Sequence, residues 1–235
     1  LVDDNDPNKV IGRPTIYMVI DVFSRMVAGF YIGFDNASFP VAMKALISSF
    51  SSKVDICKKY GIDISDEQWP CIGIPDVLLA DRGELMSHQA SYLVNGIKVR
   101  LESAPPRRGD AKGIVERSFG AFQAKFKPYM PGVVSGNKVK KHGEKDYRVE
   151  AAVAKSDFFE IILYSILAHN LNKPMEKYDR ASDMPESIPS IPIELWRWGL
   201  QHRTGSLRTV DTDIAKILLL PREKVTVSEL GVKLW

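Results

Sequence analysis

The sequence has only two cysteines, Cys57 and Cys71, and neither lies in a Cys-X-X-Cys pair or another metal-type spacing. This excludes a zinc module and a disulfide-rich secreted fold, and it indicates a reducing compartment. No apolar run approaches the roughly 20 residues that a membrane-spanning helix needs. The acidic start at residues 1–4 is unlike a signal peptide, and the absent initiator Met suggests a fragment of a longer protein.

Several kinds of catalytic centre are also missing. The histidines are scattered and form no ligand pair at helical spacing; they are His88, His142, His169 and His202. Ser24 and Ser87 lie in no nucleophile-elbow context, which argues against Ser–His–Asp chemistry. The chain has no Walker loop, and no Gly-X-Gly-X-X-Gly follows a predicted strand. Nucleotide-binding folds of those two classes are therefore not expected.

The composition is that of an ordinary globular protein, with 45% hydrophobic and 26% charged residues in a chain of 235. That length predicts one main domain with an appended piece. The net charge is only +3, but it is unevenly distributed. Between Arg107 and Arg148 there are eleven Lys/Arg and four Asp/Glu, a local charge of +7, which leaves about −4 for the rest. This asymmetry favours an anionic partner, although a solvated basic loop gives the same pattern.

Strand and helix signals alternate along the chain and predict an α/β fold with a mixed sheet. Residues 15–20 and 26–32 are typical of an antiparallel hairpin. Ser38 and Pro40 indicate the start of a helix that continues to about residue 60. The further elements that we expect are strands at 77–80 and 97–102, helices at 84–95, 113–127, 151–172 and 193–202, and β-structure at 224–227 and 232–235.

Two carboxylates stand out from this pattern. Asp81 directly follows the apolar run 77–80, and open α/β sheets place their sites at such strand ends. Glu116 lies in the first turn of a predicted helix, after a basic loop. Converging acidic oxygens beside arginines would suit magnesium ions and a phosphate backbone. A turn-capping role for Asp81 and a favourable helix N-terminal charge for Glu116 are the alternatives.

Three segments resemble a known family. Residues 77–84 (Val-Leu-Leu-Ala-Asp-Arg-Gly-Glu) and 104–117 (Ala-Pro-Pro-Arg-Arg-Gly-Asp-Ala-Lys-Gly-Ile-Val-Glu-Arg) resemble the second and third acidic blocks of the retroviral-integrase superfamily. The hairpin at 17–25 resembles its second strand and turn. The block 105–113, with Gln-His-Arg-Thr-Gly-Ser-Leu-Arg at 201–208, resembles more narrowly the TnsB-type DDE transposases of heteromeric bacterial transposons.

The resemblance implies an RNase H-like core flanked by helices over residues 1–175, a Pro-rich connector and helix over 176–204, and the start of a small β-barrel over 205–235. It implies cleavage at transposon 3′ ends and strand transfer into target DNA with two Mg²⁺ ions, for which Mn²⁺ can substitute. Asp81 and Glu116 would be the catalytic metal ligands. The residues expected to contact DNA are Arg107, Arg108, Lys112, Arg117, Gln123 and Lys127.

The resemblance also implies partners and a location. Transposon-end and target DNA would be bound by a self-associating protein. An AAA+ target-selection ATPase and a partner endonuclease subunit would assist it in the bacterial cytoplasm, at the nucleoid. No membrane contact is expected.

The sequence leaves two alternatives for the first acidic ligand of the family. In the family it lies on a strand before the hairpin, so that Leu1-Val2 would be the tail of this strand and the aspartate would precede Leu1. Asp21 is the alternative, because it precedes Asp81 by a family-like distance. Its context, a strand end followed by Val-Phe-Ser-Arg, favours a turn that holds the hairpin.

Two other functions are compatible with the same residues. An RNase H-like nuclease would use the same carboxylates and only hydrolyse DNA. A non-catalytic DNA-binding module would keep the basic segment and use its acidic residues structurally.

Overall fold

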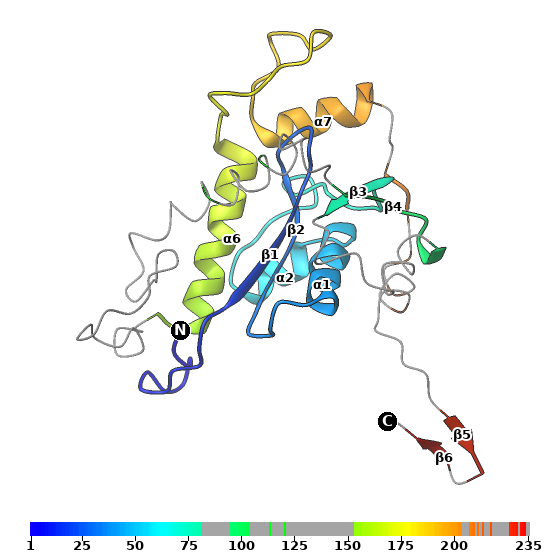
Figure 1. Ribbon diagram of the computed structural model, residues 1–235. Coiled ribbons are helices and arrows are strands. Elements are labelled where there is room, and N and C mark those ends of the chain that lie inside the picture. The colour runs from blue at the N-terminus through cyan, green and yellow to red at the C-terminus, as the bar shows by residue number, and fades with distance from the viewer. Residues whose placement is uncertain are drawn as a thin grey trace, which may run out of the picture.

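The computed structural model describes residues 1–80, 95–103, 113, 120, 153–203, 207–209, 211, 213, 217, 226–229 and 231–233. These residues form helices and small β-sheets (Figure 1). The predicted α/β class is therefore confirmed. No helix in these ranges is both long and apolar enough to cross a membrane.

A β-hairpin lies at the centre of the described structure, as predicted. Strand β1 (Thr15–Ile20) pairs antiparallel with β2 (Val27–Gly33), from Thr15 opposite Gly33 to Ile20 opposite Val27. The register shifts between Val19 and Ile20, which leaves an extra residue in β2, a β-bulge.

The polar groups beside this bulge are satisfied inside the core. The side chain of Asn170, which is fully buried, accepts a bond from the Val27 amide at 3.0 Å and donates to the Val27 carbonyl at 3.1 Å. The indole of Trp69 donates to the same carbonyl at 2.8 Å. The bulge is thus fixed by side chains far away in the sequence, because a buried backbone group without a partner is costly.

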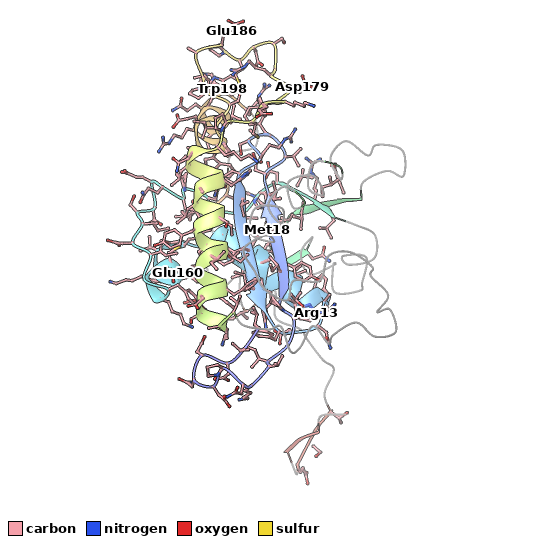
Figure 2. All side chains as sticks on the ribbon, turned by 90° about the vertical axis from the view of Figure 1, so that its left-hand side faces the viewer. Arg13, Met18, Glu160, Asp179, Glu186 and Trp198 are labelled. Atoms are coloured by element: carbon pink, nitrogen blue, oxygen red, sulfur yellow. The ribbon has the colours of Figure 1, made fainter. Side chains whose placement is uncertain are left out.

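Two helices enclose the hairpin. Helix α1 (Phe39–Phe50) packs on one face and α6 (Lys155–Asn172) runs along the other (Figure 1). Figure 2 shows α6 in front of the two strands, with Met18 near the middle of the hairpin. Gly29 permits the close approach of α1, because a Cβ there would lie 2.6 Å from the Cα of Ser49. The helix α6 buries Phe158, Phe159, Ile162, Leu163, Ile166 and Leu167.

The helix predicted from residue 38 to residue 60 is two helices. After α1 the chain turns at Ser51, whose backbone is extended, and α2 (Val54–Lys59) follows. Serines explain the break, since their hydroxyls compete for backbone groups. The Ser51 hydroxyl donates to the Ile47 carbonyl at 3.0 Å, and the Ser52 hydroxyl accepts from the Val54 amide at 3.2 Å.

A second sheet contains two short parallel strands, β3 (Val77–Ala80) and β4 (Arg100–Ser103). The first has the predicted bounds. The second begins three residues later than predicted, because Lys98 has a left-handed backbone with φ 53° that interrupts the extended chain. The predicted alternation is nevertheless present, with Ile97 and Val99 buried and Lys98 and Arg100 exposed.

The connector after α6 leads into α7 (Pro192–His202), close to the predicted range (Figure 1). Arg180 holds this connector together by donating to the carbonyls of Pro185 and Ile188 and to the hydroxyl of Ser190. Figure 2 shows Asp179 and Glu186 on the connector, beyond α7.

The fold departs from expectation in two further respects. The described strands form three two-stranded sheets, not one mixed sheet, and β1 pairs with β2 alone. The third sheet, the hairpin of β5 (Thr226–Ser228) and β6 (Gly231–Lys233), lies where β-structure was predicted, and the described residues close no barrel. Ile161, predicted for the buried face of α6, is exposed, because it lies on the side of the helix away from the hairpin. The described part of that helix begins at Lys155.

Candidate active site at the ends of two parallel strands

The carboxyl ends of β3 and β4 lie side by side. The two strands are paired in register from Val77 opposite Arg100 to Ala80 opposite Ser103. Asp81 is the next residue after Ala80, and the basic segment 104–112 follows Ser103 in the sequence. Adjacent strands are about 4.8 Å apart. The chain therefore enters the Asp81 segment and the basic segment before Glu116 from neighbouring points at one edge of a sheet.

The predicted site residues themselves lie outside the described residues. These are Asp81, Arg107, Arg108, Lys112, Glu116, Arg117, Gln123 and Lys127. Within the predicted helix 113–127, Gly113 and Gly120 are described, and both are helical. The structure thus describes the two strands that lead to the site. The roles of the site's side chains remain predictions from the sequence.

A hydrophobic core supports both strands. Leu78 of β3 and Leu101 of β4 pack against buried residues of α1, together with Ile97 and Val99, which precede β4. Val19 of the hairpin belongs to the same cluster. The helix α1 therefore holds the parallel strands and the hairpin in one arrangement, although the two sheets are not hydrogen-bonded to each other.

The described geometry of Asp21 is that of a turn residue. Its carboxylate accepts bonds from the amide of Ser24 at 2.7 Å and from the hydroxyl of Ser24 at 2.6 Å. The Asp21 amide donates to the Met26 carbonyl and the Arg25 amide to the Asp21 carbonyl, both at 2.9 Å. The predicted turn is confirmed. Among the described residues, no group of three His, Cys, Asp or Glu side chains could hold a metal ion, so Asp21 has no such partners there.

Aromatic packing fixes this turn against α7, a feature that the sequence did not predict. Phe23 stacks on Trp198, with ring centroids 5.7 Å apart, and its carbonyl accepts from the Tyr178 hydroxyl at 3.1 Å. The guanidinium of Arg203 lies 5.2 Å from the Phe23 ring and 5.1 Å from the Trp198 ring. A Cβ at Gly199 would come within 2.9 Å of Phe23, so this contact requires glycine. The turn is therefore packed against α7 through Phe23.

The two cysteines are buried beside a buried lysine. Lys53 is 1% exposed, and its ammonium donates to the carbonyls of Cys71 and Ser49. Burial lowers the pKa of Lys53 to about 8 and raises the pKa of Cys57 to about 11 and that of Cys71 to about 12. Both thiols therefore stay protonated at neutral pH, which makes them poor nucleophiles and poor metal ligands.

Val2, expected in the tail of a sheet strand, joins neither of these sheets. It forms isolated bridges with Val10 and with Ala154 at the start of α6. Its amide donates to the Val153 carbonyl at 3.0 Å. The first residues thus pack against the base of α6.

Comparison with known proteins identifies the family. A model described as the TnsB C-terminal domain matches residues 1–132, more than half of the chain. The chain therefore belongs to the TnsB family. It is 57% identical over all 235 residues to the Transposon Tn7 transposition protein TnsB of Escherichia coli, and it covers 34% of that protein. It is 25% identical over 128 residues to the Transposase for transposon Tn552 of Staphylococcus aureus, covering 54% of this chain and 24% of that protein. The chain thus spans about a third and a quarter of the lengths of these relatives.

Proposed function

We propose that the chain is part of the catalytic core of a DDE-type transposase, which cleaves transposon 3′ ends and joins them to target DNA. The observation that carries this proposal is the register of β3 and β4, whose carboxyl ends lead into the Asp81 and Glu116 segments from adjacent positions. Membership in the TnsB family and two relatives with names of transposition proteins support it.

Asp81 and Glu116 would be the metal ligands of this core. Carboxylate oxygens are the ligands that Mg²⁺ and Mn²⁺ prefer. The described residues contain no competing cluster of three potential ligands, and both buried thiols remain protonated. The donor chemistry therefore fits a divalent cation held by the two carboxylates and by a third acidic residue. When bound, such ions stabilise charge on the attacking and leaving oxygens of a phosphodiester.

The basic segment after β4 would bind the DNA backbone. Arg107, Arg108, Lys112 and Arg117 would contact phosphates beside the scissile bond. Gln123 and Lys127, 7 and 11 residues after Glu116 on the same face of the predicted helix, would extend this contact. Further partners are proposed from the family alone. They are a second copy of the protein on DNA, an AAA+ target-selection ATPase and an endonuclease subunit, all in the bacterial cytoplasm.

The test uses full-length protein, pre-cut transposon ends and a supercoiled target plasmid with Mg²⁺. Asp81→Asn and Glu116→Gln each remove a ligand charge and keep the side-chain shape, so we expect both to abolish joining while DNA binding persists. The matched control is Asp63→Asn, the same chemical change at an exposed carboxylate, which should leave joining unchanged. Joining by either site variant above a few per cent of wild type would contradict the assignment. Hydrolysis of the target plasmid without joined products from the wild type would instead indicate a hydrolytic nuclease.

A further inference from the structure

Arg208 connects three segments that are far apart in the sequence. Its backbone forms an antiparallel bridge with Ile74, with the Ile74 amide donating to the Arg208 carbonyl at 2.8 Å and the Arg208 amide donating back at 3.0 Å. Its guanidinium donates to the carbonyl of Lys98 at 2.9 Å and to that of Pro75 at 3.4 Å. It also forms an ion pair with Asp76 at 3.3 Å.

These contacts lie at the amino ends of the two parallel strands. Pro75 and Asp76 immediately precede β3, and Lys98 precedes β4 by two residues. The Asp76 carbonyl accepts the Arg100 amide at 2.8 Å, which begins the pairing of the two strands. One side chain therefore fixes the start of both strands, while Asp81 and the basic segment follow their opposite ends.

The approach of this segment is built into the neighbouring backbone. Gly73 has a left-handed φ of 119°, and a Cβ there would lie 2.9 Å from Leu207 Cβ and 3.1 Å from the Arg208 carbonyl oxygen. Leu207 packs against the main core. A glycine is thus required where residues 207–208 dock, which identifies the contact as a specific part of the fold.

The strand pair needs such support. Two-stranded sheets are marginally stable on their own, and parallel pairing is weaker per residue than antiparallel pairing. Each strand has only four residues, and no third strand joins them among the described residues. A planar guanidinium presents several donors in fixed directions, so it can bridge two carbonyls and a carboxylate together; an ammonium cannot reproduce that geometry.

We propose that Arg208 is a positioning residue for the acidic site: by tying the amino ends of β3 and β4 together, it sets the relative position of the segments that carry Asp81 and Glu116. This inference rests on the proposed function. Arg208 acts through the two strands, because four residues of extended chain place it roughly 10–13 Å from their carboxyl ends.

The test compares Arg208→Met with Arg203→Met in the full-length protein. Arg203 is five residues earlier in the chain and also makes an ion pair, to Asp183 at 2.8 Å, and ring contacts to Phe23 and Trp198, and none of these partners belongs to β3 or β4. Hydrogen exchange should accelerate at residues 77–80 and 100–103 in Arg208→Met and remain at the wild-type rate there in Arg203→Met. The Mg²⁺ concentration for half-maximal strand transfer should rise about fivefold to tenfold in Arg208→Met only. Groups bonded directly to metal ligands change metal affinity by roughly 10- to 100-fold, and the effect here should be smaller because Arg208 acts through the strands.

Arg208→Lys covers the case in which Arg208→Met does not fold. A lysine keeps the charge for Asp76 but not the bridge between the strands. The Mg²⁺ requirement of Arg208→Lys should therefore lie between those of wild type and Arg208→Met. If Arg208→Met does not fold, the Mg²⁺ requirement of Arg208→Lys should still be higher than that of wild type. Wild-type exchange and an unchanged Mg²⁺ requirement in the folded Arg208 variants would overturn the inference. Failure of the proposed function is seen separately, because Asp81→Asn would then retain joining whatever the Arg208 variants do.

Discussion

The role of Asp21 can be decided by three substitutions at the hairpin turn. In the described structure its carboxylate accepts two bonds from Ser24, which is fully buried. Asp21→Ala removes the oxygen that accepts both bonds, Asp21→Asn keeps an oxygen but removes the charge, and Ser24→Ala removes the donor hydroxyl and keeps the carboxylate. A structural aspartate and a metal ligand respond differently to this series.

The magnitudes follow from the hydrogen bonds. A bond to a charged acceptor contributes about 1.5–3 kcal/mol, and a buried amide left without a partner adds its own desolvation cost. We therefore expect Asp21→Ala to lower the free energy of unfolding by about 2–4 kcal/mol. In Asp21→Asn the amide oxygen still accepts, so the loss should be about 1 kcal/mol, as it should in Ser24→Ala. For a domain of this size, each kcal/mol corresponds to roughly 2–4 °C in melting temperature.

Thermal melting and the joining assay on full-length protein provide the two readouts. If Asp21 only holds the turn, Asp21→Asn should join pre-cut ends at nearly the wild-type rate and Ser24→Ala should behave in the same way. If Asp21 is the first acidic ligand, Asp21→Asn should lose joining as completely as Asp81→Asn while Ser24→Ala stays active. That second pattern would refute the interpretation of Asp21 as a purely structural turn residue.

Three further predictions address binding and stability. Changing Arg107 and Arg108 to Glu should flatten the salt dependence of DNA binding by about 0.9 in slope for each phosphate that is no longer neutralised, measured by titration over a range of salt; an unchanged slope would assign both residues to solvent. The depressed pKa of Lys53, about 8 against its ordinary 10.5, means that the unfolded chain binds more protons between these values. The free energy of unfolding of wild type relative to Lys53→Met should therefore rise by about 2 kcal/mol from about pH 7 to about pH 9.5, in denaturant titrations, and no change would contradict the buried charge. Gly29→Ala places a Cβ 2.6 Å from a backbone Cα of α1 and should cost about 1–3 kcal/mol in the same titrations, whereas Gly120→Ala meets none of the described residues within 4 Å and should be neutral or stabilising.

The difference between predicted and observed elements has a local cause at each point. The helix expected to reach residue 60 is interrupted because serine hydroxyls bind nearby backbone groups at Ser51 and Ser52. The start of β4 shifts because Lys98 adopts a left-handed conformation that hydrophobic alternation does not reveal. The alternation itself was predicted correctly, since Ile97 and Val99 are buried whichever residue begins the strand.

The sequence by itself determined the α/β class, the hairpin with its Asp21 turn, the strand before Asp81 and the family resemblance. These depend on short-range signals: β-branched runs, turn residues, strand-end carboxylates and ordered motifs. Only the tertiary structure decided that Asn170 and Trp69 close the bulge at Val27, that Lys53 is buried near two cysteines, and that Arg208 joins the starts of β3 and β4. Each of these contacts brings together residues that are distant in the sequence or turns a side chain inward, and local propensity carries no information about which distant partner the folded chain will place there.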